Sequence, residues 1–270
     1  MALKALVDLD YLSSGSGEEH LQIVEALDVL GEISLAEDET KAETLKEIED
    51  LTNKGMGGEI TFRESLEQRL RLLRAHKKHL QPLVETLRKR ISTSFVRNRS
   101  FFEENHENIF IISNGFKEFI VPIVGEYGIK EENVFANTFE YDEDGRITGF
   151  DRNNILSSNN GKVEQLKSIN LQGDVYVIGD GYTDYEIKAA GLANKFYAFT
   201  ENVERNNVLE KADHITPSLD EFLYLHKLNK VISYPKNRIN VLLLENVHPD
   251  ALKMMKNEGY SVTTIPGALD

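Results

Sequence analysis

Short apolar runs alternate with helical stretches along the chain, and most of the runs end abruptly at a polar residue or a glycine. The runs cover residues 3–7, 108–112, 175–178 and 195–199. A short continuous apolar run is typical of a strand that is buried on both faces. Strands that alternate with helices predict an α/β fold, a Rossmann-like parallel sheet with right-handed crossovers.

The segment between the first two predicted strands has helical spacing from about residue 21 to residue 90. Its clearest stretch places Leu80, Leu83, Leu87 and Ile91 on one face, with Pro82 near a helix start. The segment is too long for a single crossover, so it predicts a helical cap inserted over the strand ends. We therefore expect a core domain at residues 1–20 and 92–228 and a cap subdomain at residues 21–91.

Two further patterns follow the cap. Residues 137–141 and 146–150 flank Asp142-Glu-Asp-Gly145, which predicts a β-hairpin flap. From about residue 229 a linker leads into an apolar run at 240–245, a helix that opens at His248-Pro249, and a strand at 260–265. This tail reads as one partial βαβ unit, and it lacks the glycine-rich GxGxxG turn that a dinucleotide site needs.

Composition excludes several classes of function. The 270 residues include no cysteine, so disulfides, thiolate metal sites and cysteine nucleophiles are ruled out. No segment approaches the ~18 apolar residues of a membrane span, and the first apolar run is too short for a signal peptide. The formal net charge of −14 disfavours nucleic acid and anionic lipid as partners. We therefore expect a soluble, cytoplasmic protein.

The basic run from Arg69 to Lys78 is the one stretch that resembles a nucleic-acid patch. Leu66, Leu70 and Leu73 supply an apolar stripe at helical spacing through the same region. The pattern therefore favours a solvated helix face.

Carboxylates follow the third predicted strand directly. Asp180 comes after Gly179, and Asp184 begins the next helical pattern. Mg²⁺ prefers oxygen ligands, and open α/β sheets bind ligands just beyond the carboxyl ends of their strands. The two residues therefore predict a site for a hard divalent cation, although Asp184 alone also suits a helix N-cap.

Four strand-end motifs recur in a fixed order. They are Asp8-Leu-Asp10, Ser113-Asn-Gly115, Gly161-Lys-Val163 and Gly179-Asp-Gly-Tyr-Thr-Asp184. Their order and spacing resemble the haloacid dehalogenase superfamily, in its phosphoserine phosphatase branch, over about residues 1–228. The tail resembles the opening segment of D-3-phosphoglycerate dehydrogenase. Some bacterial proteins fuse the two enzymes, with the phosphatase first and the dehydrogenase second.

The resemblance implies Mg²⁺-dependent hydrolysis of L-phosphoserine in serine biosynthesis, through an aspartyl-phosphate. Asp8 would be the nucleophile and Asp10 the acid and base, as carboxylate chemistry allows. Ser113 and Lys162 would hold phosphate oxygens. Asn114 and Gly115 would complete the loop that carries Ser113. The implied metal ligands are Asp8, the backbone carbonyl of Asp10, Asp180 and Asp184.

The resemblance also implies a set of substrate-selecting residues in the cap. Glu25 would meet the substrate ammonium and Arg69 its carboxylate, a task that suits a guanidinium. Met56 and Phe62 would close over the substrate. Each also has an ordinary reading, Met56 and Phe62 as core residues and Glu25 as an exposed acid at a helix start.

The first motif departs from the family pattern. Leu12 stands where the family has threonine, and a Ser-Gly-rich insertion separates Asp10 from Glu25. Thr183 stands where many relatives have asparagine, and Asn114 where many have glycine. The alternatives are therefore an inactive, ligand-binding domain that docks on a fused dehydrogenase, a phosphatase of another small phosphate, and a phosphotransferase.

Overall fold

A computed structural model of the chain describes residues 4–7, 11–12, 24–56, 58–244 and 247–265. Its centre is a six-stranded parallel sheet with the order β10-β9-β8-β1-β4-β5. The strands are β1 (Lys4–Val7), β4 (Ile109–Phe116), β5 (Val134–Asn137), β8 (Val175–Gly179), β9 (Lys195–Phe199) and β10 (His214–Thr216). The four predicted strands and their parallel arrangement are confirmed, and β5 and β10 are additions at the two edges.

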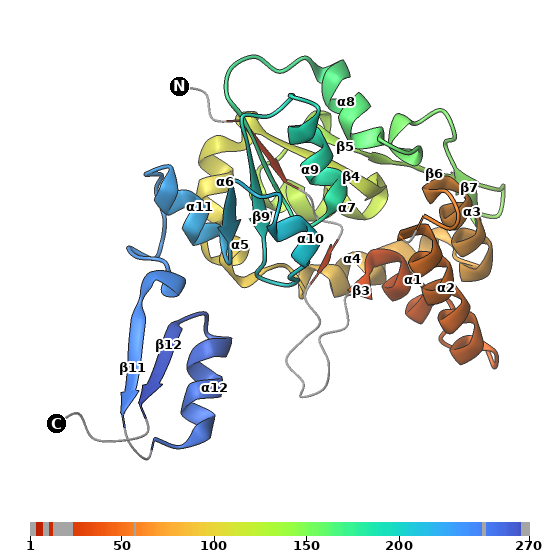
Figure 1. Ribbon diagram of the computed structural model, residues 1–270. Helices are drawn as coiled ribbons and strands as arrows, with labels where there is room; N and C mark the ends of the chain where they lie inside the picture. Colours follow the sequence, from red (N-terminus) through yellow and green to blue (C-terminus); the bar gives the residue numbers. More distant parts are fainter. Residues whose placement is uncertain (1–3, 8–10, 13–23, 57, 245–246, 266–270) are drawn as a thin grey trace.

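Helices cover both faces of this sheet (Figure 1). One layer contains α5 (Thr93–Arg97), α6 (Arg99–Asn105), α7 (Lys117–Val124) and α11 (Leu219–Leu225). The other contains α8 (Gly161–Ile169), α9 (Tyr182–Ala189) and α10 (Asn206–Leu209). Tyr176 and Ile178 of β8 face the first layer, whereas Val175 and Val177 face the second. This double burial explains the unbroken apolar run in the sequence.

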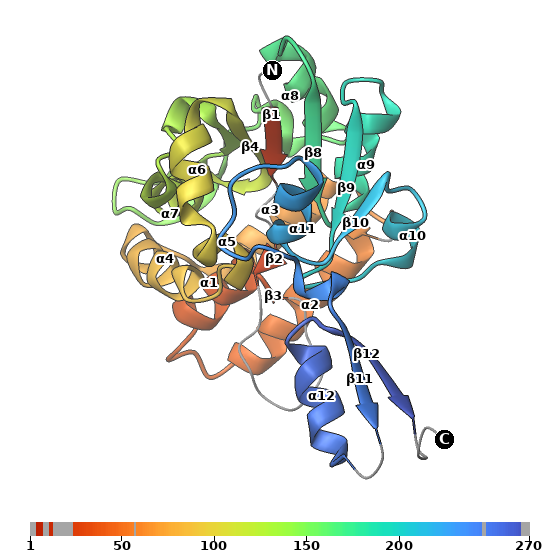
Figure 2. The ribbon, with the colours of Figure 1, turned by 90° about the vertical axis from the view of Figure 1, so that its left-hand side faces the viewer.

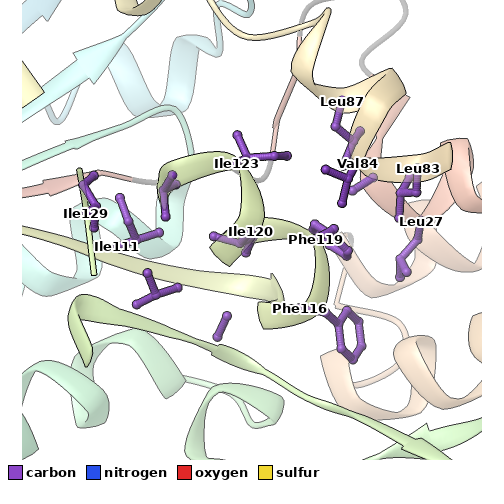
Figure 3. Close-up of a cluster of buried hydrophobic side chains, with 14 of the residues drawn as sticks. Leu27, Leu83, Val84, Leu87, Ile111, Phe116, Phe119, Ile120, Ile123 and Ile129 are labelled. Carbon is purple, nitrogen blue, oxygen red and sulfur yellow. The ribbon is translucent and has the colours of Figure 1, made fainter. Parts of the chain in front are cut away.

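The helices of the segment expected to form a cap, called the cap below, precede β4 along the chain. The helices are α1 (Ala26–Ser34), α2 (Lys41–Met56), α3 (Phe62–Leu73) and α4 (Leu80–Arg88). A short antiparallel pair, β2 (Tyr11–Leu12) and β3 (Val24–Glu25), comes before them along the chain. The expected helical character is thus confirmed, in the described residues, as four separate helices, whereas Val24–Glu25 form a strand instead of helix. Figure 3 shows Leu83, Val84 and Leu87 of α4 directed toward Phe119 and Ile123 of α7. One apolar cluster therefore runs from the cap into the core.

The predicted flap is the antiparallel hairpin of β6 (Phe139–Tyr141) and β7 (Ile147–Phe150). Its first strand begins later than expected, because Asn137 pairs within the main sheet as the end of β5. Gly145 adopts a φ of 86°, which the turn between the strands requires. The 3-10 helices are η1 (Lys77–His79), η2 (His106–Asn108), η3 (Gly125–Tyr127), η4 (Glu131–Asn133), η5 (Ile155–Ser157) and η6 (Lys236–Arg238).

The tail forms the expected βαβ unit, with β11 (Asn240–Leu244) parallel to β12 (Ser261–Ile265) and α12 (Pro249–Asn257) between them. Figures 1 and 2 show it set apart from the sandwich of sheet and helices. Leu242 and Leu244 are 47% and 41% exposed. Among the helices that the structure describes, none is both long and apolar enough to cross a membrane.

Candidate active site

The site lies where the carboxyl ends of three adjacent strands meet. β1 lies between β4 and β8, and its last residue, Val7, pairs with Ile111 on one side and Ile178 on the other. Asp180 follows two residues after Ile178, and Ser113 two residues after Ile111. The next predicted residues along β1, Asp8 and Asp10, lie outside the described part of the chain.

β4 carries the turn expected to bind phosphate. The strand does not end before Ser113, as the sequence predicted, but continues to Phe116 with a register shift after Ile112. The Ser113 side chain is fully buried, and its hydroxyl oxygen accepts a hydrogen bond from the Gly115 N–H at 2.9 Å. The Asn137 side-chain amide donates to the Asn114 carbonyl at 2.8 Å. These bonds fix the backbone of the turn in one conformation.

Lys162 and Asp184 form an ion pair behind this edge of the sheet. The Lys162 Nζ lies 3.0 Å from Asp184 Oδ1, and the two side chains are 2% and 3% exposed. Lys162 is therefore a buried residue, whereas a lysine at a helix start ordinarily lies at the surface. Asp184 Oδ2 accepts from the Gly181 N–H at 3.1 Å. Gly181 is the N-cap of α9 and Asp184 is its N3 residue, so the ordinary reading of Asp184 as the N-cap itself is wrong.

Gly179 is required by this arrangement. A Cβ atom at this position would lie 2.3 Å from Asp184 Oδ2, closer than any side chain tolerates. The glycine that ends β8 thus lets the Asp184 carboxylate pack directly against the strand end.

Asp180 is held by an arginine that the sequence analysis did not identify. The Arg205 Nη1 donates to the Asp180 carbonyl at 2.8 Å and forms an ion pair with Asp180 Oδ2. Arg205 comes from the loop between β9 and α10, and no local pattern in the sequence distinguishes it. Asn137 was also missed, although its side chain is fully buried beside the turn.

The charges around Asp180 fit a divalent cation. Burial raises the pKa of the Asp180 carboxyl to about 6, and the positive charges of Arg205 and Lys162 only partly oppose this effect. A buried carboxylate whose ionised form remains costly is a good ligand for a hard cation. Within the described ranges, no three acidic or histidine side chains gather as a metal site. A third carboxylate ligand would therefore come from outside those ranges.

The cap and the core enclose a cleft of about 780 Å³ above these residues. Asn114, Gly115, Lys162 and Phe62 line it, together with Arg205. Ser113, Asp180 and Asp184 lie behind the wall and contact residues that line it.

The cap residues expected to select the substrate have mixed outcomes. Arg69 is only 4% exposed, so the solvated helix face predicted for it is wrong. Its Nη1 donates to Thr52 Oγ1 at 3.1 Å, and Thr52 lines the cleft. Glu25 ends β3 and Met56 ends α2, but their side chains are outside the described part.

The family model for haloacid dehalogenase-like hydrolases matches residues 27–187, more than half of the chain. The chain therefore belongs to this family. It is 30% identical over 181 residues to a phosphoserine phosphatase of Drosophila melanogaster, which covers 66% of each chain. It is also 30% identical over 171 residues to a chloroplastic phosphoserine phosphatase of Arabidopsis thaliana, covering 62% of this chain and 58% of the relative. The chain thus spans under two thirds of the length of both relatives.

Solved structures share the fold. A phosphoserine phosphohydrolase-like protein from Francisella tularensis is 27% identical, with a TM-score of 0.67 over 82% of this chain and 98% of its own. The structure of DsGPDH of Dunaliella salina is 19% identical, with a TM-score of 0.58. That match covers 96% of this chain and 42% of the Dunaliella chain, so most of the tail is included.

Proposed function

We propose that the chain is a Mg²⁺-dependent phosphomonoesterase that hydrolyses L-phosphoserine to L-serine and phosphate. The observation that carries this proposal is the meeting of Lys162, the Asn114–Gly115 turn and Asp180 at one edge of the sheet, next to the end of β1. Phosphoryl transfer needs positioning and charge neutralisation of this kind. The similarity to phosphoserine phosphatases supports the choice of substrate.

The chemistry is assigned to the residues at the strand ends. The Asp8 carboxylate attacks phosphorus, and the serine alkoxide leaves with a proton from the Asp10 carboxyl. Asp10 then takes a proton from the water that attacks the aspartyl-phosphate, which releases phosphate and restores Asp8. Asp8, the Asp10 carbonyl and Asp180 would hold Mg²⁺, with Asp184 in support, and the ion would supply charge neutralisation at the phosphoryl oxygens.

The remaining candidate residues are assigned to binding the substrate. The Ser113 hydroxyl and the Lys162 ammonium hold phosphate oxygens, and Arg69 binds the substrate carboxylate. Glu25 is assigned to the substrate ammonium, and Met56 and Phe62 to closing over the substrate. Burial of Arg69 beside Thr52 supports its role, because a guanidinium out of water binds a carboxylate more strongly.

The direct test is phosphate release from phosphoserine by the purified chain, with Mg²⁺ and with EDTA. Asp8→Asn should abolish release, whereas the exposed Asp50→Asn on α2 should leave it unchanged. Absence of metal-dependent release would overturn the proposal. A panel of other phosphomonoesters, with an added alcohol as acceptor, separates a different substrate and a phosphotransferase from the proposed reaction.

The inactive alternative is favoured by one observation, Leu12 at the threonine position of the first motif. Leu12 pairs with Val24 in the β2–β3 ribbon, so this residue serves as part of a strand. Calorimetry distinguishes the two functions, because binding of phosphoserine with Mg²⁺ but without turnover would indicate a ligand-binding domain.

We also propose that the tail is a docking unit for a dehydrogenase-like domain. Its exposed Leu242 and Leu244 are apolar side chains of a two-stranded sheet that is too small to be stable alone. The extent of the Dunaliella match supports this reading at the level of the fold. Limited proteolysis near Tyr234 tests whether the tail packs on the rest of the chain, and its rapid loss would contradict such packing.

A further inference from the structure

Helix α3, which carries Arg69, is attached to the core near its first turn. The Arg63 Nη2 donates to Ser157 Oγ at 2.9 Å and to the Arg152 carbonyl at 3.3 Å. The Arg63 Nε donates to the Ser157 carbonyl at 3.4 Å. Arg152 also pairs with Glu67 of the same helix, 3.1 Å away. The Arg63 side chain of the cap thus forms hydrogen bonds to two residues of the core, Arg152 and Ser157.

A second attachment follows the end of α3. The Lys77 N–H donates to the Gly145 carbonyl, and the Ile147 N–H donates to the Ala75 carbonyl, both at 2.9 Å. These backbone bonds join the segment after α3 to the hairpin of β6 and β7. Helix α3 is therefore held at both ends, whereas α2 packs against α1 and α3, its neighbours in the cap.

Ser157, to which Arg63 donates, lies in a closely packed part of the core. Ser157 is fully buried, and its hydroxyl donates to the Asn154 carbonyl at 2.8 Å. The Asn154 amide donates to the Ala136 carbonyl of β5 at 2.8 Å. A Cβ at Gly161 would lie 2.6 Å from the Ile155 carbonyl oxygen, so the chain is tightly packed up to the residue before Lys162.

Arg63 therefore bridges the two walls of the cleft. Residues 58–62, 64 and 65 line the cleft from the cap, and residues 158–162 line it from the core. Arg63 extends from the first segment to Ser157, which adjoins the second. Because a helix rises 1.5 Å per residue, Arg63 and Arg69 lie only about 9 Å apart along α3. The position of Arg69, whose Nη1 donates to the cleft-lining Thr52, thus depends on this bridge.

We propose that Arg63 is a positioning residue that sets the separation between Arg69 and Lys162. The bridge makes the cleft select phosphomonoesters that carry a carboxylate at short reach from the phosphate. This inference rests on the proposed function, in which Lys162 holds the phosphate and Arg69 the carboxylate.

Arg63→Ala tests the inference through a comparison of two substrates, phosphoserine and the carboxylate-free phosphoethanolamine. A shift of about 1 Å in a positioning group can change rates by up to about 10²-fold. We expect Arg63→Ala to lower kcat/KM for phosphoserine by about tenfold relative to phosphoethanolamine, mainly through KM. Arg63→Lys should recover part of the loss, because an ammonium keeps the positive charge but lacks the planar set of donors that binds both Ser157 and Arg152.

Two controls separate positioning from a general loss of structure. Arg71→Ala changes an exposed arginine of the same helix and should change kcat/KM for neither substrate. Ser157→Ala should reproduce the substrate-selective loss, and combining it with Arg63→Ala should add little more. An equal loss for both substrates, or no loss, would overturn the inference.

Calorimetry with Mg²⁺ provides a second readout that does not need turnover. Arg63→Ala should weaken binding of phosphoserine and leave binding of inorganic phosphate unchanged. If the wild-type chain binds phosphate but not phosphoserine, the proposed substrate is wrong and the inference is overturned with it. If the wild type binds both and Arg63→Ala weakens both equally, only the inference about Arg63 is wrong.

Discussion

Replacing Lys162 by methionine removes the cationic partner of a carboxylate that is almost completely buried. Asp184 is 3% exposed and lies 3.0 Å from the Lys162 ammonium. Removing one partner of a buried ion pair costs about 3–5 kcal/mol, because the remaining charge stays buried without compensation. Asp184 keeps its hydrogen bond from Gly181. We therefore expect the lower end of that range, a decrease of about 3 kcal/mol in the free energy of unfolding.

Urea unfolding in EDTA, followed by circular dichroism, measures this loss. Lys167→Met on the same helix is the matched control, because Lys167 is 50% exposed and should cost less than about 0.5 kcal/mol. The double variant Lys162→Met with Asp184→Asn removes both charges, so it should be more stable than the sum of the single losses predicts. Strict additivity, or a loss as small as that of Lys167→Met, would refute charge compensation as the basis of the pair.

Three further changes have defined outcomes. Gly179→Ala places a Cβ against the Asp184 carboxylate, so we expect a loss of about 1–3 kcal/mol in urea unfolding. Arg238→Ala removes the ion-pair partner of buried Glu221, so trypsin should release the tail faster than it does from the wild type. Burial raises the pKa of Glu201 above its ordinary value of 4.5. The protonated form is favoured in the fold, so stability present below pH 4.5 is lost as pH rises through the raised pKa. Thermal melts at a series of pH values should show a smaller decline for Glu201→Gln than for the wild type. A wild type that becomes more stable than the variant as pH rises would contradict the assignment.

The sequence predicted the interior of the sheet better than its edges. β8 and β4 are continuous apolar runs because helices cover both their faces, and such runs are visible without any structure. β10 was missed because its three residues form an edge strand with an exposed Ile215. The end of β4 was misplaced because Ser113, Asn114 and Gly115 have the composition of a turn, and the turn is built as an irregular continuation of the strand.

Candidate residues that directly follow strands were visible in the sequence, whereas Arg205 and Asn137, which lie beside them in the structure, were not. Lys162 was found through its family motif, but its burial depends on Asp184, twenty-two residues later. Arg205 reaches Asp180 from a separate loop, so its role depends on tertiary structure alone. The burial of Arg69 had a usable signal, because it occupies helical spacing between Leu66 and Leu73.

The balance of charge around the cleft links the proposed metal to the proposed substrate. The chain carries a net charge of −14, and the described site offsets the two carboxylates of Asp180 and Asp184 with Lys162 and Arg205. A phosphate monoester adds about −1.5 to −2 charges at neutral pH. Burial raises the pKa of Asp180 to about 6 before any substrate is added, so the ionised carboxylate is costly there and an added phosphate would bring further negative charge. A divalent cation at the strand ends would offset both charges, so the metal and the phosphate should each favour binding of the other.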